Sequence, residues 1–246
     1  MARELVGLRV DVIATIGADA TLAARNATGV IPIVMLSAGD PVGSGLVASL
    51  ANPGGNVTGL SMSGPQIEAK RLEILKEALP GLRRVGLLAD PGTSIFGYWP
   101  ESLEQASRSL DMQLIVAEIH ALEELDRALA SIVRQGGQAV VIHSDVLFWR
   151  RPEQVMASVM KYRLPAAVEG RPLLDAGGLV SYEADEEEQL ARFATFVDRI
   201  LRGSRAADLP VEQPKKFRMM VNLKTAASLG LTVPRSLILR ADTVLS

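Results

Sequence analysis

The sequence predicts an α/β fold in which two lobes each hold a doubly wound, mostly parallel sheet. Short β-branched apolar runs alternate with helical patterns along the chain, which is typical of βαβ units. A long amphipathic pattern that stops at Pro80 and Gly81 separates an early series of such runs from a later one. The 246 residues, 48% of them hydrophobic, are enough for two packed domains.

The first lobe is predicted from the start of the chain. Residues 1–9 are typical of the end of an amphipathic helix, and the stretch 53–56 is a turn signal before the last strand of this series. The expected elements are a strand at 10–15, a helix at 19–26, a strand at 31–36, a helix at 43–50 and a strand at 56–61. These elements make a small lobe.

The second lobe is predicted from a longer series that begins with a helix at 66–79. That helix carries a stripe of period 3.6, formed by Ile67, Arg71, Ile74, Leu75 and Ala78. Strands are then expected at 84–89, 113–118, 138–142, 164–168 and 178–182, with helices at 100–110, 122–135 and 152–162. Five strands and their crossovers make a complete lobe.

Three further elements close the pattern. A helix is expected at 185–203, because its acidic first turn suits the positive end of a helix dipole. A strand at 217–221 and a short helix at 223–229 follow. The predicted lobes are residues 1–63 with 184–208, and residues 64–183 with 209–246.

Composition excludes several classes of function. The chain has no cysteine, which rules out disulfides, thiol nucleophiles and Cys-based metal sites, and its two histidines are His120 and His143. The 26 Lys and Arg residues are scattered among 28 Asp and Glu residues, unlike the basic patch of a nucleic-acid binder. No apolar run approaches the roughly 20 residues of a membrane-spanning helix, and no export signal is recognisable. We expect no metal, no cofactor and no nucleic-acid partner.

Two motifs suggest enzyme chemistry, and each has a simpler interpretation. Residues 43–48 match the G-x-G-x-x-A form of the dinucleotide fingerprint, but the loop before them is long and no strand ending in a carboxylate follows at the required spacing. His143, Ser144 and Asp145 are consecutive, so their side chains point in different directions and form a relay only with difficulty. Asp145 is either a ligand-binding group or a helix cap. We expect no catalytic residues.

The aromatic residues indicate where a ligand binds. In a doubly wound sheet of order 2-1-3-4-5, the first and third strands flank the topological switch point, where ligands bind at the carboxyl ends. Half of the ten aromatic residues follow these two strands of the second lobe: Phe96, Tyr98, Trp99, Phe148 and Trp149. Apolar rings with a few polar groups suit a small-molecule pocket. The alternative is that the rings cover loop bases or the neighbouring lobe.

Polar residues near these rings would suit a zwitterion. Thr93 and Ser94 stand near a helix start, where hydroxyl and backbone N–H groups hold a carboxylate, and Asp145 would hold an ammonium group. Helix capping alone explains the two hydroxyl residues equally well. Beyond the fourth strand lie Glu169, Arg171 and Asp175, of which at least one is expected to face the crevice.

Several segments together carry a family resemblance. They are Asp-Pro-Val-Gly-Ser-Gly-Leu-Val at 40–47, Pro-Gly-Gly-Asn-Val-Thr-Gly at 53–59, Lys-Arg-Leu-Glu at 70–73, Ala-Gly-Gly-Leu-Val-Ser-Tyr at 176–182, Asp-Leu-Pro-Val-Glu-Gln-Pro at 208–214 and Val-Asn-Leu-Lys-Thr-Ala at 221–226. In combination they resemble the ABC-transporter substrate-binding family that includes the tryptophan and tyrosine binders. The resemblance runs over nearly the whole chain.

The resemblance implies a type I periplasmic binding protein, in which two α/β lobes joined by three crossovers close on a small aromatic or amino-acid-like ligand and deliver it to an ABC permease. It implies a periplasmic or cell-surface lipoprotein location for the full-length form. The ligand-binding residues expected from the resemblance and from the switch-point loops are Gly17, Asp40, Thr93, Ser94, Phe96, Asp145, Phe148, Glu169 and Asp185. The alternatives are the effector-sensing domain of a regulator, which shares this architecture, and a small-molecule α/β enzyme.

The first lobe is expected to be incomplete. By comparison with the family, a strand, a helix and a second strand are missing before Met1, in addition to an export signal. The strand at 10–15 would then lack a neighbour, and a parallel edge with unpaired N–H and C=O groups recruits other chains. The chain is therefore expected to self-associate through that edge.

Overall fold

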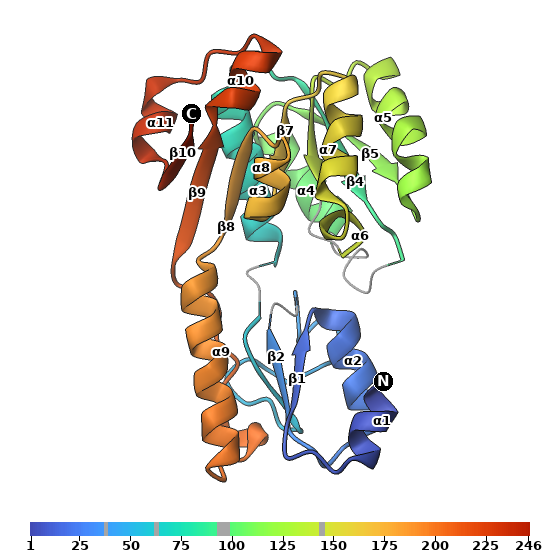
Figure 1. Cartoon of the computed structure of the whole chain (residues 1–246), viewed down its shortest axis with the longest axis vertical. Coiled ribbons are helices and arrows are strands. Elements are labelled where there is room, and N and C mark those ends of the chain that lie inside the picture. The colour runs from blue at the N-terminus through green and yellow to red at the C-terminus, as the bar shows by residue number, and fades with distance from the viewer. Residues whose placement is uncertain (37–38, 62–63, 93–98, 143–145) are drawn as a thin grey trace. The chain divides into compact units, whose positions relative to one another are not determined.

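A computed structural model describes residues 1–36, 39–61, 64–92, 99–142 and 146–246. The chain forms two compact units (Figure 1). The first consists of Met1–Gly64 and Ala184–Phe217, and the second of Pro65–Glu183 and Arg218–Ser246. The polypeptide therefore passes between the units three times.

The first unit is built on a parallel sheet of the order β1-β2-β3. Its strands are β1 (Ile13–Ile16), β2 (Ile33–Leu36) and β3 (Val57–Gly59). Alternate side chains of β2 enter two different cores, since Ile33 and Met35 pack on one face of the sheet and Val34 and Leu36 on the other. Both faces of the sheet are therefore buried at β2, as expected of a parallel sheet, whereas Ala14 and Ile16 of β1 are exposed.

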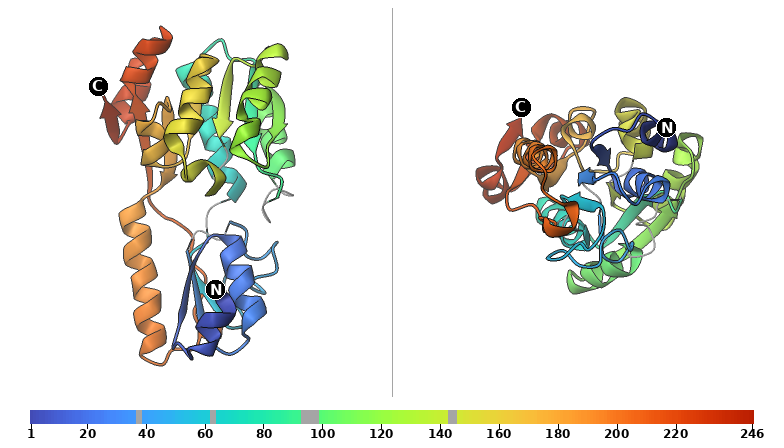
Figure 2. Two further views of the ribbon diagram at one scale, coloured as in Figure 1. Left: turned by 45° about the vertical axis from the view of Figure 1, so that its right-hand side comes forward. Right: turned by 90° about the horizontal axis from the view of Figure 1, so that it is seen from below.

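Helices cover both faces of this sheet (Figures 1 and 2). The helices α1 (Ala2–Gly7) and α2 (Ala18–Ala27) contribute to the core that holds Ile33, whereas α9 (Glu186–Leu201) and the 3-10 turn η3 (Ala206–Asp208) contribute to the core that holds Val34. Phe196 and Ile200 are the buried anchors of α9.

The helix predicted at 43–50 is wrong, because this stretch consists of turns and bends. Gly45 has a φ of 69°, which is outside the helical region, and the N–H of Val47 donates to the carbonyl of Pro41. The side chain of Asp40 accepts hydrogen bonds from the N–H groups of Val42 and Gly43. Such local side-chain bonds offer the backbone an alternative to the helix.

The segment that returns from α9 is anchored on the first unit. The Thr58 hydroxyl donates to the carbonyl of Leu209 at 2.7 Å, and the N–H of Val211 donates to the carbonyl of Leu50 at 2.7 Å. Residues 209–217 thus belong with the first unit, whereas the sequence analysis assigned them to the second lobe. The difference arises because a segment without periodic pattern gives no sign of the unit on which it packs.

The second unit is built on a sheet in which the described residues form seven strands of the order β10-β9-β8-β7-β6-β4-β5. The pairs β4–β5, β4–β6, β6–β7, β7–β8 and β9–β10 are parallel. The strands are β4 (Arg84–Ala89), β5 (Gln113–Glu118), β6 (Ala139–Ile142), β7 (Ala166–Val168), β8 (Val180–Ala184), β9 (Phe217–Asn222) and β10 (Thr243–Leu245). The predicted order 2-1-3-4-5 is confirmed by β5-β4-β6-β7-β8, and β9 and β10 extend it.

Two layers of helices enclose this sheet (Figure 1). One core holds side chains of α3 (Gly64–Ala78), α4 (Trp99–Ser109), α10 (Leu223–Leu229) and α11 (Arg235–Arg240). The other holds side chains of α5 (Leu125–Arg134), α6 (Val146–Trp149), α7 (Pro152–Lys161) and α8 (Arg171–Asp175), with the 3-10 turn η2 (Leu122–Glu124) before α5. The unit is therefore doubly wound, as predicted.

Within the part of the chain that the structure describes, no helix combines the length and the apolar character needed to cross a lipid bilayer.

Candidate functional site

The second unit carries candidate residues at the carboxyl edge of its sheet. Glu169 follows β7 directly, and Phe148 lies in α6, shortly after β6. The carboxyl ends of parallel strands meet at one edge of a sheet, which is where ligands bind in open α/β folds. Four other predicted residues of this edge lie outside the described residues: Thr93, Ser94, Phe96 and Asp145.

Two neighbouring rings of α6 differ in exposure. Phe148 is fully buried and belongs to the core that also holds Val155 and Leu173. Trp149 is 48% exposed, and a Cβ placed on Gly170 would lie 3.9 Å from its Cζ2 atom. In this structure Phe148 is thus a packing residue, and Trp149 is the ring with surface available to a ligand beside the loop after β7.

Glu169 is nearly buried, with 6% of its surface exposed. Its Oε2 atom accepts a hydrogen bond from Arg71 Nη2 at 2.5 Å, which is also an ion pair. Its Oε1 atom makes no hydrogen bond or ion pair with any residue that the structure describes. One carboxylate oxygen at this edge is therefore held by the protein, and the other is available as an acceptor.

Arg71 is the centre of a buried cluster that we call the Arg71 cluster: Arg71 itself, Glu68, Glu169 and the carbonyl of Tyr182. The guanidinium donates from Nη1 to Glu68 Oε1 at 2.6 Å and from Nε to the Tyr182 carbonyl at 2.8 Å. Desolvation by burial acts to lower the pKa of Arg71. The charges of Glu169 and Glu68 outweigh it, so that the pKa of Arg71 is raised and the group stays charged.

A second anchor holds the loop after β7. The backbone N–H of Gly170 donates to Glu183 Oε2, and the Ser181 hydroxyl lies 3.4 Å from the same oxygen. Gly170 has a φ of 90°, a conformation that suits glycine, and it is the N-cap of α8. The backbone that carries Glu169 is thus fixed next to the point where its side chain is fixed.

The remaining charged residues predicted after β7 pair with each other on the surface. Arg171 Nε donates to Asp175 Oδ1 at 2.7 Å, and both side chains are half exposed. Such a pair along one helix is an ordinary surface feature. Of the three residues predicted after the fourth strand, Glu169 is the one that is buried and bound to a buried partner.

In the first unit, Gly17 lies between β1 and α2. Its φ is 83°, it is the N-cap of α2, and its carbonyl accepts a hydrogen bond from the Thr21 hydroxyl at 2.7 Å. Glycine is required here because the chain turns from strand to helix with a positive φ. The first N–H groups of a helix have no partner within the helix, so a helix N-terminus such as this one attracts anions.

Asp40 has a local role in the structure. Its Oδ1 atom accepts hydrogen bonds from the N–H of Val42 at 3.1 Å and of Gly43 at 2.9 Å, and its carbonyl accepts from the Ser44 hydroxyl at 2.7 Å. These bonds shape the turn after β2.

Asp185 caps α9 and is almost fully buried. Its Oδ1 atom accepts a hydrogen bond from the N–H of Glu188 at 3.1 Å, and its Oδ2 atom lies 2.9 Å from Lys216 Nζ. Both carboxylate oxygens therefore have partners within the first unit. A side chain so engaged is explained by helix capping.

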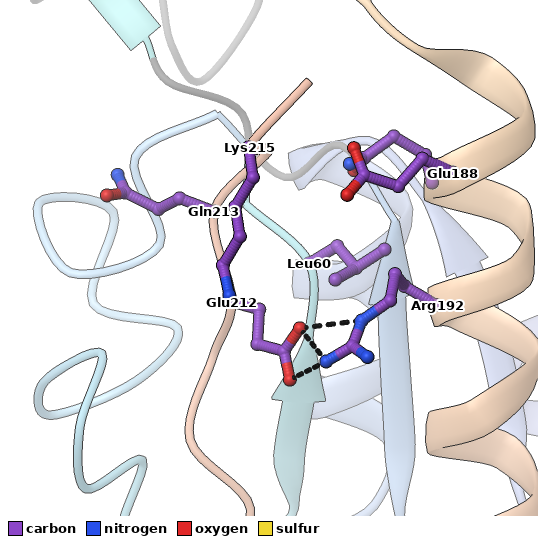
Figure 3. A pocket seen from close by; sticks show the side chains of 7 residues that line it. Leu60, Glu188, Arg192, Glu212, Gln213 and Lys215 are labelled. Atoms are coloured by element: carbon purple, nitrogen blue, oxygen red, sulfur yellow. Dashed lines mark hydrogen bonds and ion pairs between the residues drawn. The ribbon is translucent and has the colours of Figure 1, made fainter.

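Close to this cap, the first unit has a cavity of about 90 Å³ (Figure 3). Its lining residues come from the end of β3, from α9 and from the returning segment: Leu60, Glu188, Gln189, Arg192, Glu212, Gln213 and Lys215. Arg192 and Glu212 form a bidentate ion pair across it. The cavity is smaller than the roughly 300 Å³ at which drug-sized ligand pockets begin.

A larger cavity, of about 250 Å³, lies in the second unit between α3, β9 and α11. Its charged walls are internally paired, since Lys70 binds Glu73 and Arg240 binds Glu77. Among the described residues, no group of His, Asp and Glu has the arrangement of a metal site.

The chain has two α/β units, each built on a sheet of mostly parallel strands, and it passes between them three times. This is the architecture of type I periplasmic binding proteins. The chain belongs to the ABC transporter substrate binding protein family, which it matches over residues 1–245. The family resemblance inferred from the sequence is confirmed, as is the α/β fold.

Three relatives illustrate the match. A tyrosine-binding protein of Clostridioides difficile is 27% identical over 232 residues, which cover 94% of this chain and 66% of the relative. An ABC domain in complex with L-Trp from Streptococcus pneumonia has a TM-score of 0.92 at 24% identity and covers 100% of this chain and 82% of its own. A conserved domain protein from Vibrio cholerae has a TM-score of 0.92 at 27% identity, over 99% of this chain and 81% of its own. The chain thus spans about two thirds of the length of the curated relative.

The Arg71 cluster was not predicted from the sequence. Arg71 was visible as a charged residue on the apolar stripe of a helix, and this was the signal that it is buried with a partner. Glu68 lies one turn earlier in the same helix, but the other two partners, Glu169 after β7 and Tyr182 in β8, are 98 and 111 residues away along the chain, and no sequence pattern links them to α3.

Proposed function

We propose that this chain is the solute-binding component of an ABC importer and that its ligand is a small zwitterion of the aromatic amino acid class. The observation that carries the proposal is the Glu169 carboxylate, which is nearly buried at the carboxyl end of β7 and has one oxygen available as an acceptor. A ligand ammonium group is the natural partner for such an oxygen. The relatives support this class, since one is named for tyrosine and another was solved with L-Trp.

The other candidate groups are assigned by the same proposal. Thr93, Ser94 and the helix start after Gly17 are anion-binding elements for a ligand carboxylate. Phe96 and Trp149 are candidates to contact the ligand ring, and Asp145 is a second candidate for its ammonium group. Asp40 and Asp185 remain candidates of lower weight, because their carboxylates already have local partners.

We expect the protein to release its ligand chemically unchanged, because members of this family bind their ligands and do not convert them. The partner that receives it is an ABC permease, and the protein acts outside the cytoplasmic membrane, in the periplasm or at the cell surface. We propose no cofactor.

Calorimetry with L-Trp and L-Tyr tests the proposal. We expect saturable binding of one or both, and weaker binding of tryptamine and of indole-3-propionate, which lack the carboxylate and the ammonium group respectively. Glu169→Gln should weaken binding of the amino acid roughly tenfold or more, equivalent to about 1.4 kcal/mol per factor of ten. The matched control is Glu73→Gln, which changes an exposed glutamate of the same unit.

Three results would contradict the proposal. Absence of binding to the wild-type protein removes the amino acid as ligand class. Unchanged affinity of Glu169→Gln removes Glu169 from the site. Chemical conversion of the bound ligand, followed by mass spectrometry, replaces the binding protein with an enzyme.

We also propose self-association through β1. Among the described strands, β1 pairs with β2 alone, and Ile16 at its end is 69% exposed. A parallel edge with unpaired backbone groups pairs with a second copy unless a charge blocks it. Sedimentation should show concentration-dependent dimers, and Ile16→Lys should reduce them. A protein that stays monomeric at all concentrations would refute self-association through β1.

A further inference from the structure

We infer that Arg71 is a positioning residue for ligand recognition, which holds Glu169 in the one orientation that presents its free oxygen to a primary ammonium group. This inference rests on the proposed function and adds to it a residue that does not itself touch the ligand. It also narrows the ligand class to molecules that carry a cationic donor.

The geometry of the Arg71 cluster fixes the position of the Glu169 carboxylate. The Arg71 guanidinium uses each of its three nitrogens on a different acceptor: the Tyr182 carbonyl, Glu68 and Glu169. The three acceptors come from β8, α3 and the loop after β7. A planar fork with fixed donor directions therefore determines where the Glu169 carboxylate lies, which a flexible Lys ammonium could not do.

Burial of the cluster gives little stability by itself. Arg71 is 1% exposed and Glu68 0%, so the cluster holds charges that have left water. A buried ion pair is often no more stabilising than apolar side chains of the same volume. Stability is thus a weak reason for placing an arginine on the apolar stripe of α3, and fixing the orientation of a functional carboxylate is a stronger one.

Electrostatics favour a cation beside Glu169. Arg71 forms ion pairs with the carboxylates of Glu68 and Glu169, and the charge of Glu183 also acts on it. A ligand ammonium beside Glu169 Oε1 would donate to a carboxylate oxygen and be attracted by its negative charge. An anionic group at the same place would be repelled by that carboxylate in a region largely removed from water. The cluster therefore selects for a cationic donor.

The backbone beside Glu169 is also fixed. Gly170, next to Glu169, is held by its N–H on Glu183 and lies beside Trp149. With the side chain fixed by Arg71 and the backbone fixed by Glu183, the acceptor is preorganised before the ligand arrives. Preorganisation reduces the entropy that binding would otherwise lose.

The test is calorimetry on the full chain with L-Trp and indole-3-propionate, which differ in the ammonium group. We expect Arg71→Lys to weaken L-Trp binding roughly tenfold and to change indole-3-propionate binding less than threefold. The control Lys70→Met removes an exposed cation on the same helix and should change neither. The double variant Arg71→Lys, Glu169→Gln should bind L-Trp no more weakly than Glu169→Gln alone, because both changes act through one carboxylate.

A measurement on the wild-type protein keeps the inference testable if Arg71→Lys does not fold. The resonance of the Arg71 Nη2–H group, which donates to Glu169, should shift more when L-Trp is added than when indole-3-propionate is added. The inference is overturned if L-Trp leaves this resonance unmoved, or if a folded Arg71→Lys variant keeps wild-type affinity for L-Trp. If the wild-type protein binds no amino acid at all, the proposed function fails first, and the inference fails with it.

Discussion

Arg71 and Arg192 are both helix residues paired with glutamate, and they differ in their surroundings. Arg71, in the second unit, is buried and has three acceptors on three elements. Arg192, in the first unit, is 46% exposed and forms its ion pair with Glu212. Burial raises the free-energy consequence of losing a charge partner, while water screens an exposed pair. Losing the buried arginine is therefore expected to cost the second unit more stability than losing the exposed arginine costs the first unit.

Removal of the buried guanidinium is the largest effect we predict. Arg71→Met should destabilise the second unit by about 3–5 kcal/mol, because Glu68 and Glu169 remain buried without their cation. Both tryptophans belong to this unit, so urea unfolding followed by tryptophan fluorescence reports on it specifically. If Arg71→Met unfolds at the same urea concentration as the wild type, the predicted difference between the buried and the exposed arginine is wrong.

The cap of α9 should have an intermediate effect. Asp185→Ala removes the acceptor for the Glu188 N–H and the partner of Lys216, and we expect a loss of about 1–2 kcal/mol. Asp185→Asn keeps a capping acceptor and should recover most of it. Hydrogen exchange of the first-turn amides of α9 measures the change, and equal exchange in Ala and Asn variants would disprove the capping role.

The exposed pair should matter least for stability. Arg192→Ala is expected to cost below about 1 kcal/mol, and added salt should shrink this difference because the pair is open to solvent. Hydrogen exchange of α9 and β3 at low and high salt measures it. An effect as large as that of Arg71→Met would show that exposure does not separate the two arginines.

A pH dependence of still smaller size is expected at Glu124. The backbone N–H of His120 donates to its carboxylate, and this bond lowers the pKa of Glu124. A lowered pKa contributes stability above the unfolded-state pKa, and that contribution disappears as the pH falls through the folded-state pKa. Glu124→Gln should therefore lower Tm slightly at neutral pH and leave it unchanged in acid. A Tm difference that persists in acid would contradict this.

The sequence predicted the fold where its signals are local and repeated. Strands β4 to β8 follow from buried apolar runs that alternate with helical patterns, and their order is that of a doubly wound sheet. The stretch 43–50 misled because it has helix-like spacing, while Gly45 and the Asp40 side chain favour turns. The single-turn helices α6 and α8 were missed, since one turn is too short to show a period.

The candidate site was less predictable for a different reason. The position of Glu169 after a strand was readable, but its hydrogen bond to Arg71 joins residues 98 positions apart. Sequence alone also could not decide between the adjacent rings Phe148 and Trp149, because the burial of each depends on how α6 packs against α7 and α8.

The bond between Thr58 and Leu209 joins residues 151 positions apart, and it has a consequence for synthesis. The face of β2 that carries Val34 and Leu36 is covered by α9, which leaves the ribosome long after the strand itself. At about 5–20 residues per second, the wait is roughly 8 to 30 seconds. Throughout that interval the nascent chain exposes an apolar strand face, so the first unit, although translated first, is the part of the nascent chain that we expect a chaperone to protect.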